Sequence, residues 1–204
     1  MRTRGPDDRR QSATGYALLW LAAVASSLLL IAMSLWMGDV NQDEGWYLYA
    51  GRLVAEGANP FVDFASTQGP VMAYVYALAW PLVSALGVAG GRLFTAALGL
   101  LSFAGTAWLT WRLAVRRRRT LAPAAATGAF VLVALNLYHV YFSTVVKTYS
   151  LTACFLVFGF VALAYGVSGT SGGRGRGCGR GADVGLAVLA GGLFALATAT
   201  RSSA

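Results

Sequence analysis

Residues 39–70, DVNQDEGWYLYAGRLVAEGANPFVDFASTQGP, form the stretch that decides how the rest of the chain is arranged. It is the one long polar segment between strongly apolar ones, and it holds five of the eight acidic residues: Asp39, Asp43, Glu44, Glu56 and Asp63. It directly follows residues 16–37, an uncharged run as long as the ~20 apolar residues needed to cross a bilayer. The sequence therefore predicts a carboxylate cluster at the mouth of a first transmembrane helix.

The composition indicates that lipid is the solvent for most of the chain. Soluble domains carry about 25% charged residues, whereas this chain has 12% charged residues, 57% hydrophobic residues and a mean hydropathy of +0.59. The predicted fold class is an all-α, polytopic transmembrane helical bundle. The net charge of +8 does not indicate nucleic-acid binding, because the arginines lie in short clusters between apolar runs, a pattern typical of cytoplasmic loops.

Four parts are predicted along the chain. Residues 1–15 form a disordered cytoplasmic tail, residues 16–37 the first transmembrane helix, and residues 38–92 an outer-face acidic loop with juxtamembrane helices. Residues 93–204 contain four further transmembrane helices, at 93–111, 121–142, 148–167 and 184–200, with Arg-rich cytoplasmic loops. One of these loops, residues 168–181, is expected to be a flexible Gly/Arg linker. Cys154 and Cys178 lie in different environments, so we expect no disulfide.

The topology depends on residues 70–88, an uncharged run that is long enough to span but is interrupted by Pro81. If this run spans, nine basic residues lie outside and seven inside. If it stays at the outer face, twelve lie inside, and only Arg52, Arg92, Lys147 and Arg201 lie outside. The positive-inside rule favours the second arrangement. We therefore predict five spans in the cell membrane, a cytoplasmic N-terminus, and a broken juxtamembrane helix at 70–88.

The acidic loop carries a local helix signal and a pair of neighbouring carboxylates. Asn41-x-x-Glu44 is typical of a capping box, and Gly57 is a suitable stop for a short helix. Asp43 and Glu44 are adjacent, so their side chains do not point the same way. This favours one catalytic carboxylate beside one capping or orienting carboxylate. The alternative is that both residues only start a helix and complement its dipole.

The wider pattern resembles the first outer loop of the GT-C glycosyltransferases, and within them the protein mannosyltransferases and lipid A aminoarabinose transferases. Asp43-Glu44-x-x-Tyr47-x-x-Ala50 follows the first span, and Gly57-x-x-Pro60-Phe61-x-Asp63-Phe64 and Gln68-Gly69-Pro70 come behind it. The glycines before Arg92 and the Ala-Thr-Arg201 ending fit the same pattern. The resemblance covers nearly all of this chain but only the front part of such an enzyme.

The resemblance implies transfer of a sugar from a polyprenyl-phosphate donor to a lipid, glycan or protein acceptor at the outer face. Asp43 would be the catalytic base, with Glu44 beside it, and Tyr47, Asp63 and Gln68 would contact substrate. Asp63 has a second interpretation, as an N-cap near the juxtamembrane helix, which we favour slightly. Membrane lipid is expected to contact the transmembrane helices.

The chain departs from the family at two places. Gln68 and Gly69 stand where related enzymes often have Lys or His before the proline, and residues 144–149 of the second outer loop contain no acid. We therefore predict no metal ligands. A divalent cation is compatible with the family, but no second acidic loop supports one. Lys147 and Arg92 are candidates for the phosphate contact, and snorkelling to the interface is an equally good interpretation of Lys147.

Other residues have structural interpretations, and two other function classes stay open. Asn136, a polar residue in an apolar run, is expected to bond to a neighbouring helix, and His139 to lie at the interface. One rival function is a non-catalytic membrane protein whose acidic loop binds a partner or a cation. The other is a transporter fragment in which Asp43 and Lys147 are charge partners along a path.

Overall fold

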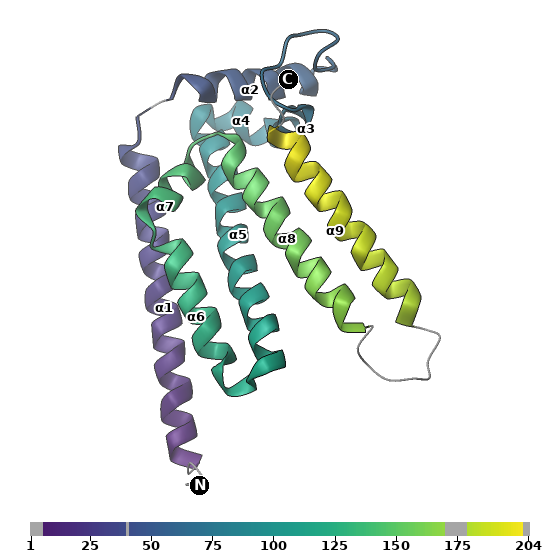
Figure 1. The fold of residues 1–204 in the computed structure, drawn as a ribbon. Helices are drawn as coiled ribbons and strands as arrows, with labels where there is room; N and C mark the ends of the chain where they lie inside the picture. Colours follow the sequence, from purple (N-terminus) through teal and green to yellow (C-terminus); the bar gives the residue numbers. More distant parts are fainter. Residues whose placement is uncertain (1–5, 40, 170–178, 202–204) are drawn as a thin grey trace.

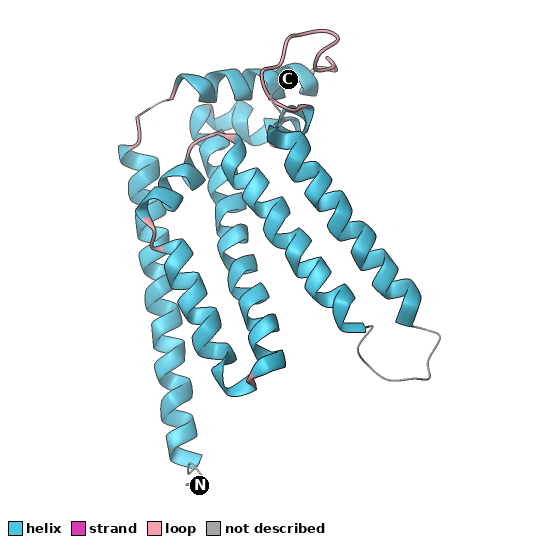
Figure 2. Ribbon diagram, in the orientation of Figure 1, coloured by secondary structure: helices cyan, strands magenta, loops and turns pink. Residues whose placement is uncertain are grey.

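The computed structural model describes residues 6–39, 41–169 and 179–201, and within them every element is helical apart from one isolated β-bridge between Pro60 and Phe64 (Figure 2). The elements are α1 (Pro6–Met37), α2 (Gln42–Ala55), α3 (Pro70–Leu78), α4 (Trp80–Leu86), α5 (Val88–Arg117), η1 (Arg119–Leu121), α6 (Ala122–Ala134), α7 (Leu137–Thr144), α8 (Thr148–Gly169) and α9 (Gly179–Arg201). The all-α prediction is therefore confirmed for the described residues.

The long helices lie side by side, and the short ones gather at one end of the bundle. Helices α2, α3 and α4 lie across the end at which α1 finishes and α5 begins (Figure 1). The N-terminal end of α1 and the turn between α5 and α6 lie at the opposite end. Helix α9 returns to the end that holds α2, where it packs against α3.

Four of the described helices are long and apolar enough to cross a membrane: Thr14–Met37, Val88–Arg117, Thr148–Gly166 and Val184–Arg201. The pair Arg119–Ala134 and Leu137–Thr144 makes a fifth candidate if it is counted as one broken span. Helix α1 also turns large apolar side chains away from the protein, since Leu18, Leu21 and Leu29 are each more than half exposed. Such a surface indicates a membrane protein.

The prediction of a broken helix at 70–88 is confirmed. Helix α3 ends at Leu78, and α4 begins at Trp80 with a proline in its first turn. Pro81 has no N–H, and its ring clashes with the carbonyl four residues earlier, so α3 cannot continue through it. A second break follows at Gly87, whose φ of +62° ends α4 and starts α5 in a conformation that suits glycine.

Several predicted boundaries move. Helix α1 begins at Pro6, inside the predicted disordered tail, and residues 1–5 lie outside the described part. Helix α5 begins at Val88, so Arg92 belongs to a long helix and not to the loop. Helices α8 and α9 reach Gly169 and Gly179, so only residues 170–178 of the predicted linker, Cys178 among them, lie outside the described residues.

The run 121–142 is not one straight helix, because α6 and α7 meet at a bend of 65°. Asn136 lies at this bend and is the N-cap of α7: its side-chain oxygen accepts a hydrogen bond from the His139 N–H at 3.0 Å. The expectation that Asn136 bonds to a neighbouring helix was therefore wrong. A capping side chain satisfies a backbone donor at the break, which explains how a polar residue fits into this apolar run.

A small apolar core supports the layer formed by α2, α3 and α4. Leu48, Met72, Tyr76, Ala79, Val83 and Val146 are its buried members. Gly51 lets α2 approach α3 closely, because a Cβ at this position would lie 2.9 Å from the Tyr76 Cβ. The Tyr76 hydroxyl is hydrogen-bonded to the Thr95 hydroxyl, which joins α3 to α5. The acidic end of the molecule is therefore packed on its long helices.

Candidate functional site

The acidic end of the bundle is built around a buried ion pair between Glu44 on α2 and Arg92 on α5. Arg92 Nη2 lies 2.7 Å from Glu44 Oε2, and Arg92 Nε lies 2.9 Å from Glu44 Oε1. The Glu44 side chain is 0% exposed and that of Arg92 is 8% exposed. Two parallel hydrogen bonds of this kind are the strongest geometry available to an arginine and a carboxylate.

The Glu44–Arg92 pair also binds the backbone of three other segments. Arg92 donates to the carbonyl oxygens of Gly38 at 2.8 Å and Asp39 at 2.6 Å, at the end of α1. Glu44 accepts the N–H of Asn41 at 2.9 Å, which completes the predicted capping box. It also accepts the N–H of Val146 at 3.0 Å, in the connection between α7 and α8. One ion pair therefore fixes α1, α2, α5 and the α7–α8 connection to each other.

These contacts give Glu44 an orienting role. Burial raises the pKa of its carboxyl, but the hydrogen bonds from Arg92, Val146 and Asn41 outweigh burial and hold the pKa below its usual value. Glu44 is therefore ionised and its oxygens are occupied. Arg92 is equally committed, so the geometry assigns it a structural role in place of the expected phosphate contact.

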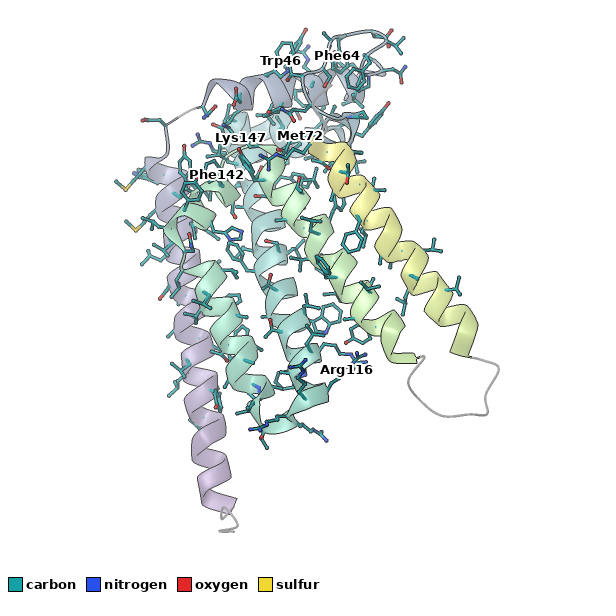
Figure 3. All side chains as sticks on the ribbon, in the orientation of Figure 1. Trp46, Phe64, Met72, Arg116, Phe142 and Lys147 are labelled. Carbon is teal, nitrogen blue, oxygen red and sulfur yellow. The ribbon has the colours of Figure 1, made fainter. Side chains whose placement is uncertain are left out.

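Asp43 occupies a different environment from its neighbour. Its carboxylate Oδ2 lies 3.0 Å from Lys147 Nζ, and the two side chains are 45% and 20% exposed respectively. The hydrogen bond to Asp43 raises the pKa of the Lys147 ammonium, which therefore stays charged. Figure 3 shows Lys147 close beneath α2, at the opposite end of the molecule from Arg116.

The residues of the two ion pairs are sequence neighbours at both ends. Asp43 directly precedes Glu44, and Lys147 directly follows Val146, whose N–H is bound by Glu44. The buried hydrogen bond between Glu44 and Val146 therefore sets how far apart Asp43 and Lys147 can lie. The structure thus separates the two adjacent carboxylates as the sequence favoured, with one held inside and one presented to the surface.

Tyr47 and Gln68 complete the group around Asp43. The Tyr47 side chain lies near Gln68 and in the electrostatic field of Asp43, Lys147 and Tyr149. Burial, and after it the charge of Asp43, raises the pKa of Tyr47, so its phenol stays protonated and can donate a hydrogen bond. We call Asp43, Tyr47, Gln68 and Lys147 the Asp43 cluster.

Asp63 does not join the Asp43 cluster. It is exposed, and its Oδ2 accepts the backbone N–H of Asn59 at 2.7 Å within the loop between α2 and α3. The N-cap of α3 is Gly69, and no side chain caps this helix. The favoured interpretation of Asp63 as an N-cap near the juxtamembrane helix was therefore wrong, because the side chain closes its own loop.

Sequence reasoning missed Tyr149, which faces both the Asp43 cluster and Arg201. The Arg201 guanidinium carbon lies 5.1 Å from the centre of the Tyr149 ring. From the sequence, Arg201 was assigned only as one of the outer-face charges and as the last residue of the pattern that resembles GT-C enzymes. Its place beside Tyr149 depends on the packing of α9 along α8, which no local signal encodes.

No metal centre is formed by the described residues, because no three His, Cys, Asp or Glu side chains among them lie close enough to hold an ion. A comparison of the chain with known protein families, with curated proteins and with solved structures found no match. The likeness to GT-C enzymes therefore stays a prediction from the sequence. A function for this chain has to be inferred from the geometry of the acidic end.

Proposed function

We propose that this protein is a multi-pass cell-membrane glycosyltransferase of the GT-C type. It would transfer a sugar from a polyprenyl-phosphate donor to a lipid, glycan or protein acceptor at the outer face. The observation that carries the proposal is the Asp43 cluster: a half-exposed carboxylate is held beside a cation, a phenol and an amide by a buried ion pair.

The proposed orientation places the Asp43 cluster outside and the N-terminus in the cytoplasm. Arg116 and the arginines that follow it lie at the end opposite to α2 (Figure 3). The cytoplasmic side is enriched in such clusters. Counting the bent pair α6 and α7 as one broken span gives five spans, and leaves α2, α3 and α4 at the outer interface.

In the proposed reaction Asp43 acts as a general base. The acceptor hydroxyl or amine gives its proton to the Asp43 carboxylate as its oxygen or nitrogen bonds to the anomeric carbon. The bond between that carbon and the phosphate oxygen breaks, and its electron pair leaves with the polyprenyl phosphate. Asp43 is accessible for this task, whereas Glu44 is fully buried and ionised. Tyr47 and Gln68 are placed to hydrogen-bond the sugar or the acceptor.

A charge-pair role in transport is the second candidate, and the contact between Asp43 and Lys147 is what favours it. Opposite charges that pair at the end of a helical bundle can take turns in binding an ion or a charged substrate. In that role the loss of either charge would stop transport and leave glycan composition unchanged. In the proposed reaction only the loss of Asp43 removes the base.

The experiment replaces Asp43 with Asn in the native host. Asparagine keeps the shape of the side chain and removes its basicity. Glu56→Gln is the matched control, because Glu56 is an exposed carboxylate at the other end of α2 and pairs with Arg52 at 2.8 Å. Envelope glycolipids and glycoproteins are compared by mass spectrometry with those of wild type and a deletion strain, at equal membrane levels of each variant.

We expect Asp43→Asn to reproduce the sugar loss of the deletion strain, and Glu56→Gln to match wild type. The missing product would then name the substrate. If the deletion loses a sugar and Asp43→Asn does not, Asp43 is not the base. If neither strain changes any glycan, the transferase is excluded and the transport role is tested next.

A further inference from the structure

Among the described residues, four basic side chains lie at the end of the bundle that holds the Asp43 cluster, and three of them already have carboxylate partners. Arg52 pairs with Glu56, Arg92 with Glu44 and Lys147 with Asp43, at distances between 2.7 and 3.0 Å. Arg201 is the fourth. Within the described part of the chain no carboxylate lies at ion-pair distance from it, and its guanidinium stacks on Tyr149. A cation without an anion beside a membrane surface is placed to bind one.

Arg201 lines a cavity of about 490 Å³ between α7, the first turn of α8 and the last turn of α9. Its other lining residues are Asn136, Tyr138, His139, Phe142 and Tyr149. The volume lies within the range of roughly 300–1,000 Å³ that is usual for small-ligand pockets. The lining combines one guanidinium with phenol, imidazole and amide groups, all of which can donate hydrogen bonds. We call this the Arg201 cavity.

We propose that the Arg201 cavity binds the phosphate group of the lipid-linked donor. The inference deepens the proposed function and rests on it for the identity of the lipid. The chemistry required is a phosphate monoester or diester held by the Arg201 fork, with the phenol and imidazole groups of the lining as further donors. Arg201 therefore takes the role that was predicted for Arg92 and Lys147, whose side chains are engaged by Glu44 and Asp43.

The position of Tyr149 connects the Arg201 cavity to the Asp43 cluster. Its ring lies under the Arg201 guanidinium and packs edge-on against Phe142, with 4.8 Å between ring centres. It also interacts electrostatically with Lys147 and Tyr47. The Arg201 cavity and the Asp43 cluster are therefore neighbours that share Tyr149. The developing charge on the leaving phosphate would meet a cation where it forms.

The test measures binding of a C55 polyprenyl phosphate to the purified protein in nanodiscs of neutral lipid. The uncharged polyprenol and inorganic phosphate are the comparison ligands, and no acceptor is present. Arg201→Gln is compared with Arg52→Gln, the matched control from the same face of the protein. Tyr138→Glu is a second variant: Tyr138 is 75% exposed, so the substitution places a negative charge at the cavity without disturbing the core.

We expect wild type and Arg52→Gln to bind the lipid phosphate at least about tenfold more tightly than the polyprenol. Arg201→Gln and Tyr138→Glu should both lose that preference and keep the binding of the polyprenol. The proposal is overturned if Arg201→Gln keeps the preference within twofold, or if Arg52→Gln loses as much. Tight binding of inorganic phosphate without the lipid phosphate would exclude the lipid as the source of the anion.

The inference and the proposed function can fail separately. If the binding preference depends on Arg201 and Asp43→Asn leaves every glycan unchanged, the cavity is a lipid-phosphate site in a protein that is not a transferase. If Asp43→Asn stops transfer and Arg201→Gln binds the lipid phosphate normally, the phosphate lies elsewhere.

Discussion

Replacing Arg92 with methionine tests whether the Glu44–Arg92 pair holds the acidic end together. The substitution leaves the Glu44 carboxylate, which is 0% exposed, with only the N–H groups of Val146 and Asn41 as partners. Removing one partner of a buried pair costs about 3–5 kcal/mol, because the remaining charge stays out of water. For a protein of this size that corresponds to a fall of roughly 6–20 °C in the thermal unfolding midpoint.

The decisive comparison is the double variant Glu44→Gln/Arg92→Met. Removing both charges also removes the unpaired buried carboxylate, so we expect the double variant to unfold at a higher temperature than Arg92→Met alone. The assay is thermal unfolding of the detergent-purified protein. Disruption of the exposed pair between Arg52 and Glu56 is the control and should leave the midpoint unchanged. Simple addition of the two single effects in the double variant would refute the reasoning.

Three further predictions concern the acidic end and the bend between α6 and α7. The pKa of Glu44 lies below its ordinary value of 4.5, so the ionised carboxylate contributes its full stability above about pH 4.5 and loses it as the pH falls through the folded-state pKa. On acidification below about pH 4.5, Glu44→Gln should therefore lose less stability than wild type, as measured by unfolding midpoints against pH. Gly51→Ala should lower the midpoint, because its Cβ would lie 2.9 Å from the Tyr76 Cβ, whereas Gly45→Ala, where nothing lies within 4 Å, should leave it equal or higher. Asn136→Ala should cost about 1 kcal/mol of stability, because it removes the cap of α7. Serine can also cap a helix, so Asn136→Ser should keep the unfolding midpoint, and an equal loss with Ser would contradict the capping role.

Features encoded over a few residues were predictable. Asn41 and Glu44 stand three positions apart, and the capping box formed as expected because its donors and acceptors belong to the same helix turn. Pro81 broke the helix at 70–88 for a similarly local reason, since a proline alone removes the hydrogen bond. The separation of Asp43 from Glu44 also follows from their adjacency.

Contacts across long separations were not predictable. Glu44 and Arg92 are 48 residues apart, and only the packing of α2 against α5 shows that they pair. The sequence therefore treated Arg92 as an available cation. No partner was predicted for Arg201, because its contact with the Tyr149 ring depends on how α9 packs in the tertiary fold. Asn136 was partly predictable: the sequence shows a polar residue in an apolar run, but it does not show that this residue caps a helix at a bend.

The reach of Glu44 along the chain has a consequence for the order in which the protein can be made. Its partners Arg92 and Val146 follow it by 48 and 102 residues. At about 5–20 residues per second, ribosomes need roughly 5–20 s to add the later of the two. Until Arg92 has been made, α2 carries a carboxylate that has no cation to pair with and must stay in contact with water. All the hydrogen bonds of Glu44 can form only after α1, α5 and the bent pair α6 and α7 have been synthesised. The acidic end therefore assembles late in biogenesis.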